Sequence, residues 1–423
     1  MVVRVPKIHD RIWPTVIIIF LLGMAVRVLL LSLLPPVPVR PAEALNIAIS
    51  LVRHGTFSDP YGSGPSGPTA HCMPLFSLLA ALVIRVFGLG SGGAFALSCF
   101  GSAAASLGYA LLAVLGRSCS LNRWVGISAG LFGALLPVNF WSQTGGEWEA
   151  PFTLLALVWL ASIAAKHWGK AEFTLKGGAI CGVAAAIATS FSPNTILILG
   201  MWSICAFIWF SKNRVAVVRY FGTACLIVLV ALAPWAIRNR IVLGSWVLTR
   251  SNFGENLQLS NNSVATSDTE FNVRNPAWSV FNPHTSPEEY LRVKQMGEVA
   301  YNEAKKQQAI QWIRSNPKRF VELSLERIAL FWFPRMLRLP QTIAMDLLTI
   351  LAIAGIVRLW KARPEIALML GGACIAYSLV YLVVEVSPRY SFPIEGFLLI
   401  LGSYAVYSWV AGRNAHSSPW CKS

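Results

Sequence analysis

Charged residues are scarce in this sequence. Asp, Glu, Lys and Arg make up only 13% of its 423 residues, whereas soluble proteins carry roughly 25%. A soluble chain of this length could not cover its surface with so few charges, and hydrophobic residues instead make up 55% of the chain. The scarcity of charge therefore excludes a soluble enzyme and a disordered tail.

Paired cysteines are also lacking. None of the eight cysteines belongs to a Cys-x-x-Cys pair, and most of them lie inside apolar runs, where cysteine behaves as a small hydrophobic residue. This distribution excludes a disulfide scaffold, and we expect neither a disulfide nor a zinc site.

Long apolar segments take the place of the missing charge. Segments of about 20 residues recur from one end of the chain to the other, which predicts transmembrane helices and argues against an outer-membrane barrel. The apolar segments lie near residues 12–34, 73–87, 93–116, 122–142, 149–166, 177–192, 194–211, 217–237, 341–360, 365–384 and 391–411.

The basic residues indicate how these segments are oriented. They gather near the N-terminus and in four junctions: Arg4, Lys7, Arg11, Arg117, Arg123, Lys166, Lys170, Lys176, Lys212, Arg214, Arg219, Arg358, Lys361 and Arg363. Because cytoplasmic loops of membrane proteins carry an excess of Lys and Arg, these junctions should be cytoplasmic. The same rule accounts for the net charge of +16, so we expect no nucleic-acid partner.

The segment at 73–87 is the shortest apolar segment and contains Arg85. An even number of spans must separate the N-terminus from the junction at 117–123, so we interpret 73–87 as a re-entrant or interfacial helix. This predicts ten spans with both termini cytoplasmic. Three parts follow: an N-terminal transmembrane module over 1–237 with an outer loop at 35–92, an outer region over 238–340, and C-terminal helices over 341–423.

The outer region contains helix signals. Ser286-Pro287-Glu288-Glu289 is a typical helix start, with Ser as N-cap, Pro at the first position and acids in the first turn. This helix is predicted to run to Asn316-Pro317. A second helix, ending near Phe333, suits the membrane interface because it combines charges with an aromatic end.

Acidic residues lie at the outer ends of the predicted spans and almost never in mid-span, where a transporter would carry them. They are Glu43 and Asp59, then Glu147 and Glu149, then Glu385 beside Arg389. Two carboxylates with basic residues nearby could form a transfer site, because an acid can serve as a general base and basic groups can stabilise a leaving phosphate. The alternative is that these acids are solvated loop residues.

Several segments carry a resemblance. They are Glu43–Ala48, His54–Tyr61, Gly67–Phe76, Glu147-Trp148-Glu149, Pro234–Asn239, Arg250–Gly254, Asn261-Asn262 and Pro388-Arg389-Tyr390. In this order they resemble the glycosyltransferase C superfamily, and they are most similar to bacterial relatives of protein O-mannosyltransferases and of the lipid A aminoarabinose transferase. The resemblance covers nearly the whole chain and does not specify a substrate.

The resemblance implies an all-α polytopic fold in the cell (inner) membrane, with the active site on the outer, periplasmic face. It implies transfer of a sugar from a polyprenyl-phosphate donor to an envelope acceptor (lipid, glycan or protein), usually with inversion. Glu43 would be the catalytic base. Glu149, or in its place Glu147, would orient the acceptor or coordinate a cation. No cofactor is required, although Glu43 and Glu149 could share a divalent cation.

The sequence departs from the superfamily pattern at a donor-phosphate contact and at the acidic residues of the first outer loop. Cys72 stands where relatives have the Lys of a Lys-Pro-Pro signature, and Ala42-Glu43 stands where many have Asp-Glu. The adjacent His71 could contact phosphate, but a neutral His is a weaker partner than Lys.

Donor and sugar contacts are predicted at six residues: His71, Arg238, Arg250, Asn252, Arg389 and Tyr390. Arginine can grip phosphate with two parallel hydrogen bonds. Arg238 could equally anchor the protein at lipid headgroups. Secondary candidates are Asp59, Glu147, Trp148, Asn256 and Asn261, for which turn formation or an interfacial aromatic belt is the alternative.

Two other functions stay open. The chain could be a lipid or polysaccharide transporter without chemistry, which predicts tolerance of Glu43→Gln. It could also be a catalytically lapsed subunit that binds a lipid-linked glycan and never turns it over.

Overall fold

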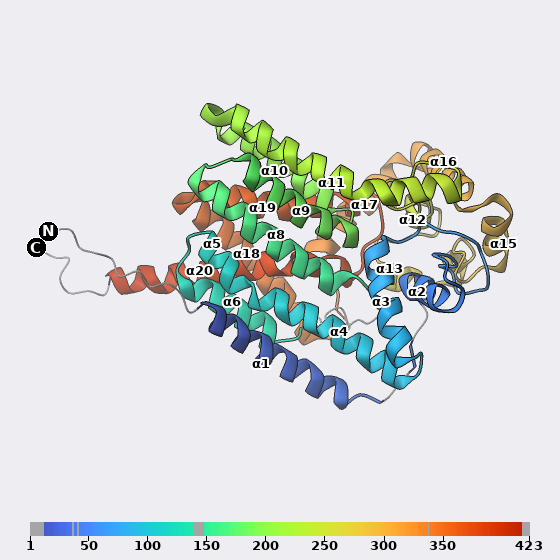
Figure 1. Ribbon diagram of the computed structural model, residues 1–423, viewed down its shortest axis with the longest axis horizontal. Helices are drawn as coiled ribbons and strands as arrows, with labels where there is room; N and C mark the ends of the chain where they lie inside the picture. The colour runs from blue at the N-terminus through green and yellow to red at the C-terminus, as the bar shows by residue number, and fades with distance from the viewer. Residues whose placement is uncertain (1–11, 36–37, 40–41, 139–147, 337, 417–423) are drawn as a thin grey trace, which may run out of the picture.

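The computed structural model describes residues 12–35, 38–39, 42–138, 148–336 and 338–416 (Figure 1). Helices account for most of these residues, and the described part of the chain contains no β-strand. The predicted all-α class is therefore confirmed.

Seven helical stretches are long and apolar enough to cross a membrane. They comprise α1 (Ile12–Ser32), α4 (Ser91–Ala110) with α5 (Leu112–Ser118), α8 (Ala150–Lys170), α11 (Arg214–Leu243), α18 (Leu339–Ala362), α19 (Pro364–Ser378) and α20 (Glu395–His416). The shorter apolar or mixed helices are α3 (Pro74–Phe87), α6 (Arg123–Leu135), α9 (Leu175–Phe191) and α10 (Thr195–Trp209). The chain is thus polytopic as predicted, whereas the number of ten spans stays a prediction.

Helix α3 has the length expected of a segment that does not cross the membrane. Its 14 residues correspond to about 21 Å at 1.5 Å per residue, against about 30 Å of hydrocarbon. Pro74 opens the helix at its first position, where a missing N–H costs no hydrogen bond.

Glycines let the membrane helices approach closely. A Cβ on Gly178 of α9 would lie 2.4 Å from the carbonyl oxygen of Tyr220 in α11, and one on Gly355 of α18 would lie 2.0 Å from that of Leu401 in α20. No side chain fits at either place, so these two helix pairs depend on glycine, as is common in membranes.

The helices of the two loops predicted to be outer gather at the end of the molecule opposite to the end of α20 (Figure 1). They are α2 (Glu43–His54), α12 (Phe253–Ser260), α13 (Thr269–Asn272), α14 (Pro276–Ser279), α15 (Pro287–Met296), α16 (Glu298–Ser315) and α17 (Pro317–Trp332). This end of the molecule contains the candidate site.

The helix predicted from Ser286 to Asn316 is in fact two helices. Its start is confirmed, because the Ser286 hydroxyl accepts a hydrogen bond from the N–H of Glu289 at 3.3 Å. At Gly297, however, the backbone has φ +77°, which ends α15 and starts α16. Glycine tolerates this conformation, and the helix periodicity on either side concealed the break.

Some charged side chains are buried within the membrane part of the described chain. Arg27 is 0% exposed in the middle of α1 and donates to the carbonyl oxygens of Gly133 and Ala134 at 2.9 Å each, at the end of α6. The Tyr109 hydroxyl donates to buried Glu395 at 2.8 Å. These charges are compensated inside the bundle, as buried charges in membranes must be.

Candidate functional site

Glu43 owes its position to α2. It is the first residue of this helix, where a carboxylate interacts favourably with the helix dipole. The apolar face of α2, including Ala44, Leu45 and Ala48, is buried against the core. The helix ends at Gly55, which adopts a left-handed conformation with φ +69°.

The Glu43 carboxylate faces two histidines. One ligand atom each from Glu43, His71 and His284 lies within 4.8 Å of the other two, and the Glu43 Oε1 to His284 Nε2 distance is 3.6 Å. Within the described residues, three buried atoms here have no hydrogen-bond partner: Glu43 Oε2, His71 Nδ1 and His284 Nε2. Buried polar atoms are rarely left unpaired, so the cluster is suited to a proton, a substrate hydroxyl or a cation.

The electrostatics of this cluster give Glu43 and His71 different protonation states. Burial alone would raise the pKa of Glu43, but His284, His71 and Arg389 outweigh it, and the pKa of Glu43 is lowered. Burial, with help from His284 and Arg250, lowers the pKa of His71 to about 3. Glu43 is therefore ionised at neutral pH while His71 is neutral, the state in which imidazole binds metal.

Tyr61 supports both histidines from behind. Its ring contacts that of His71 at 5.4 Å and that of His284 at 5.0 Å, both edge to face. The Tyr61 hydroxyl donates to Glu255 Oε2 at 2.9 Å. Glu255 is 2% exposed, and burial raises its pKa to about 8 despite this hydrogen bond.

Glu298 fixes the segment that carries His71. It accepts hydrogen bonds from the Thr69 and Ser251 hydroxyls and, at 2.7 Å, from the N–H of Ala70. Glu298 is the first residue of α16, so the break at Gly297 is what brings its carboxylate to the first outer loop.

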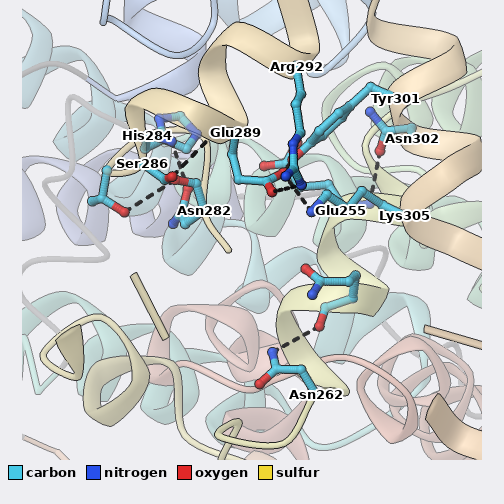
Figure 2. A network of polar contacts seen from close by, with 12 residues as sticks. Glu255, Asn262, Asn282, His284, Ser286, Glu289, Arg292, Tyr301, Asn302 and Lys305 are labelled. Atoms are coloured by element: carbon cyan, nitrogen blue, oxygen red, sulfur yellow. Dashed lines mark hydrogen bonds and ion pairs between the residues drawn. The ribbon is translucent and has the colours of Figure 1, made fainter. Parts of the chain in front are cut away.

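A buried ion pair joins α15 to α16 beside His284 (Figure 2). Glu289 lies 2.6 Å from Lys305 Nζ and accepts from the Tyr301 hydroxyl at 2.7 Å. Both charged side chains are nearly inaccessible, at 6% and 4% exposed. His284 itself is held through its backbone N–H, which donates to Asn282 Oδ1 at 2.9 Å.

Glu149 has a different partner. It precedes α8 at the N-cap position, and its carboxylate forms an ion pair with Arg250. Arg250 also donates to the carbonyl oxygen of Phe191 at 3.2 Å, at the end of α9. The sequence places Glu149 and Arg250 far apart, and the fold joins them at the meeting point of two helix ends.

Arg389 completes this second cluster. Its guanidinium carbon lies 3.6 Å from the ring centroid of Trp148, and its Nη2 donates to the Tyr390 hydroxyl at 3.1 Å. Both Glu43 and Glu149 are close enough for their charges to stabilise the Arg389 cation. Arg389 therefore links the two acidic clusters into one site.

Aromatic rings continue the site along the outer ends of α17 and α19. The Tyr390 ring stacks on Tyr381 at 5.0 Å, and Tyr381 stacks on Phe331 at 5.1 Å. A face of this kind suits the apolar part of an amphipathic ligand whose charged head lies at Arg389.

The other predicted residues serve the framework. Arg238 donates to the carbonyl oxygens of Thr69 at 2.6 Å and Phe57 at 2.8 Å. Asp59 accepts from the N–H groups of Ser66 and Gly67, closing the first outer loop.

Three predicted asparagines lie in or beside α12. Asn261 is 1% exposed and bonds to Leu257, Val383 and Arg327. Asn256 is exposed on the outer surface of α12. Asn252 is 9% exposed and follows Ser251, whose N–H donates to the carbonyl of Ala70. Glu147 lies outside the described residues.

The candidate site thus combines Glu43, His71, Glu149, Trp148, Arg250, Arg389 and Tyr390 from the sequence prediction with one residue that the prediction missed. His284 lies in a polar loop, Asn282-Pro283-His284, that carries no local motif. Only the folded outer region brings it to Glu43. Among the described residues Glu43 forms a group with two histidines that could hold a cation, and the sharing of a cation by Glu43 and Glu149 stays a prediction.

Comparison with known proteins identifies the fold. No protein-family profile matches the chain, and no curated protein matches it by sequence. The oligosaccharyltransferase of Archaeoglobus fulgidus with a tethered acceptor peptide matches with a TM-score of 0.58 and 14% identity, over 96% of this chain and 50% of that one. The oligosaccharyltransferase AglB from the same organism, with an inhibitory peptide and a dolichol-phosphate, matches at 0.56 and 13%, over 96% and 52%.

ArnT from Cupriavidus metallidurans, bound to undecaprenyl phosphate, superposes more loosely, with a TM-score of 0.42 and 12% identity over 95% of this chain and 79% of that one. The chain spans about half the length of the oligosaccharyltransferase. At these identities the comparison shows the fold alone: the chain shares the fold of the archaeal oligosaccharyltransferase, in agreement with the fold that the sequence resemblance predicted.

Proposed function

We propose that the chain is a membrane glycosyltransferase that moves a sugar from a polyprenyl-phosphate donor to an acceptor hydroxyl. One observation carries the proposal: Glu43, whose carboxylate has an unpaired buried oxygen, interacts with the charge of Arg389, and Arg389 interacts in turn with Glu149, the ion-pair partner of Arg250. Glu43 can take a proton, and the two arginines can hold a phosphate. The fold shared with an oligosaccharyltransferase supports this assignment.

The reaction is a single displacement at the anomeric carbon. The acceptor oxygen forms a bond to that carbon and gives its proton to Glu43. The bond from the carbon to the phosphate oxygen breaks, and its electron pair stays on the phosphate. Arg250 and Arg389 stabilise the charge on the leaving polyprenyl phosphate. Attack opposite the leaving group inverts the configuration.

The Glu43 cluster also fits a divalent cation. One carboxylate oxygen and two imidazole nitrogens within 4.8 Å of one another are a donor set typical of zinc or manganese more than of magnesium or calcium. The three unpaired buried atoms support this fit. When bound, such a cation would polarise the acceptor hydroxyl, while Glu43, His71 and His284 would hold it.

The shape of the molecule supports the membrane placement that we propose. The candidate site lies at the end of the molecule where α2, α12, α15 and α16 gather, and α1 begins and α20 ends at the opposite end (Figure 1). The basic junction between α5 and α6, with Arg117 and Arg123, lies on the side of the molecule opposite to the site (Figure 1), which supports an outer-face active site in the inner membrane with both termini cytoplasmic.

Donor turnover tests the proposal. The purified chain in lipid nanodiscs is mixed with polyprenyl-phosphate sugars, envelope acceptors and added Zn²⁺ or Mn²⁺, and release of polyprenyl phosphate is followed. We expect release by the wild type, loss of release in Glu43→Gln, and unchanged release in Glu303→Gln, which removes an exposed charge on α16. Donor binding without release from any donor would contradict the transferase and support the lapsed subunit. Release that survives Glu43→Gln would exclude Glu43 as base.

A further inference from the structure

The ion pair between Glu149 and Arg250 differs from the buried ion pair between Glu289 and Lys305. Glu289 and Lys305 are 6% and 4% exposed, with Tyr301 and Arg292 completing the carboxylate's hydrogen bonds. Glu149 and Arg250 keep 22% and 27% of their side chains exposed. The first pair is sealed inside the protein, whereas a ligand can reach the second.

Arg250 also has a hydrogen-bond donor that the described residues leave unpaired. Its Nε is buried and has no hydrogen-bond partner within the described residues, while its Nη2 serves both Glu149 and the carbonyl of Phe191. A guanidinium offers five donors in a planar fork that matches phosphate as well as carboxylate. Glu149 thus occupies only part of a site that a tetrahedral anion could fill.

Arg389 is the second cation at this place. Among the described residues no carboxylate lies within ion-pair distance of it, and its one side-chain hydrogen bond to them goes to Tyr390. Its charge nevertheless interacts with that of Glu149. Glu149 therefore lies in the field of two arginines, as a bound phosphate would.

We infer that the Glu149 carboxylate and the phosphate of the polyprenyl carrier exchange on Arg250. In the resting site the Glu149 carboxylate is paired with Arg250. The donor phosphate displaces this carboxylate from Arg250 when the donor binds. After transfer, the Glu149 carboxylate pairs with Arg250 again and displaces the polyprenyl phosphate. The inference rests on the proposed function and adds a product-release step to it.

The charges of donor and product explain why such a step is needed. The donor is a phosphodiester with one negative charge, whereas the product is a phosphomonoester with about −1.5 to −2 at neutral pH. Two arginines would therefore hold the product more tightly than the donor. A competing carboxylate on Arg250 weakens both, and it returns the site to a neutral pair when the product leaves.

Binding of undecaprenyl phosphate tests the exchange. The wild type and Glu149→Gln are compared in phosphatidylcholine nanodiscs, which offer no other anionic headgroup. Because the competitor is gone, we expect Glu149→Gln to bind about three- to tenfold more tightly. In an Arg250→Gln background the same substitution should produce no tightening. Glu303→Gln, which changes net charge equally at an exposed side chain of α16 paired with Lys306, should bind as the wild type does.

Product inhibition of turnover distinguishes this role of Glu149 from a purely structural one. Glu149→Gln should be inhibited by undecaprenyl phosphate at about three- to tenfold lower concentration, in line with its affinity, and its steady-state rate should fall more than its single-turnover rate. Thermal unfolding of each variant checks that it is folded. If folded Glu149→Gln binds undecaprenyl phosphate no more tightly than the wild type, the exchange is wrong.

Two controls separate the outcomes. If the wild type neither binds undecaprenyl phosphate nor turns over, the proposed function fails and the inference fails with it; if it does both and only the tightening is absent, the inference alone fails. Inorganic phosphate and phosphatidylglycerol discs serve as further probes. If Glu149→Gln gained as much affinity for inorganic phosphate or for phosphatidylglycerol as for undecaprenyl phosphate, the assignment to the polyprenyl carrier would be wrong.

Discussion

Glu43 and Glu149 are both glutamates at the start of a helix, yet different side chains pair with their carboxylates. Glu43 is the first residue of α2 and Glu149 is the N-cap of α8. Their side chains are 25% and 22% exposed. Glu43 faces two imidazoles and keeps one unpaired oxygen, whereas Glu149 is paired with a guanidinium. What a carboxylate can do is therefore set by the residues that the fold brings to it.

The difference divides the site into an acid–histidine half and an acid–arginine half. The first, Glu43 with His71 and His284, can accept a proton or hold a cation. The second, Glu149 with Arg250 and Arg389, can hold an anion. If this division is correct, substitutions in one half should change chemistry and those in the other should change binding of phosphate.

The largest expected effect comes from Glu43. Replacing it with Gln removes the base while keeping the size of the side chain, so turnover should fall by about 10²- to 10⁴-fold. The dissociation constant of undecaprenyl phosphate should change less than about threefold, since no arginine is altered. Initial rates and binding in nanodiscs measure the two quantities. A parallel loss of binding would show that the two halves are one functional unit.

Arg389→Gln should have the reverse pattern. It removes the cation that lies over Trp148 and near both acids, so affinity for undecaprenyl phosphate should fall by about 10- to 100-fold, as expected for charge-assisted hydrogen bonds. Affinity for Zn²⁺ or Mn²⁺ should not fall. Arg319→Gln removes a charge from an exposed pair on α17 and serves as the control, with phosphate affinity unchanged.

How much of this site was predictable depends on whether the signal was local. Apolar runs predicted the membrane helices because burial in lipid is a property of each segment by itself. Glu43, Glu149, Arg250 and Arg389 were proposed from short motifs at the outer ends of those segments. Their division into two halves was not, because it depends on which loops meet in space.

Three particulars show what the sequence left out. His284 has no motif around it and reaches Glu43 only through the folded outer region. Gly297 fits a helical pattern until its φ of +77° is known. Asn261 and Arg238 resemble ligand-binding residues, but buried carbonyl oxygens of neighbouring segments take their donors, because buried acceptors must be satisfied.

His284→Gln should weaken the acid–histidine half without disturbing the other. Loss of one of three ligands should raise the concentration of Zn²⁺ or Mn²⁺ needed for half-maximal turnover by at least about tenfold. Titration with metal after chelation measures this, and His54→Gln, at the exposed end of α2, is the matched control. Unchanged metal dependence, or full activity after chelation, would contradict a cation at this cluster.

The smallest expected effect is a pH dependence of stability beside the acid–arginine half. Burial raises the pKa of Glu385 to about 7, although Asn272, Arg327 and Arg389 act against it. The folded state therefore holds a proton that the unfolded state releases near pH 4.5. Stability from this group is fully present below about pH 4.5 and is lost as the pH rises through about 7. Because the side chain is only partly buried, we expect a loss of about 1 kcal/mol between pH 5 and pH 7.5.

Glu385→Gln should remove this loss, because an amide does not titrate, and it can keep the hydrogen bond that Asn272 donates at 2.6 Å. Thermal unfolding in nanodiscs at pH 5 and pH 7.5 measures the change for the wild type and the variant. Glu303→Gln is the control, because Lys306 and Gln307 lower the pKa of Glu303 and leave it ionised across this window. A slope that persists in Glu385→Gln would place the titrating group elsewhere.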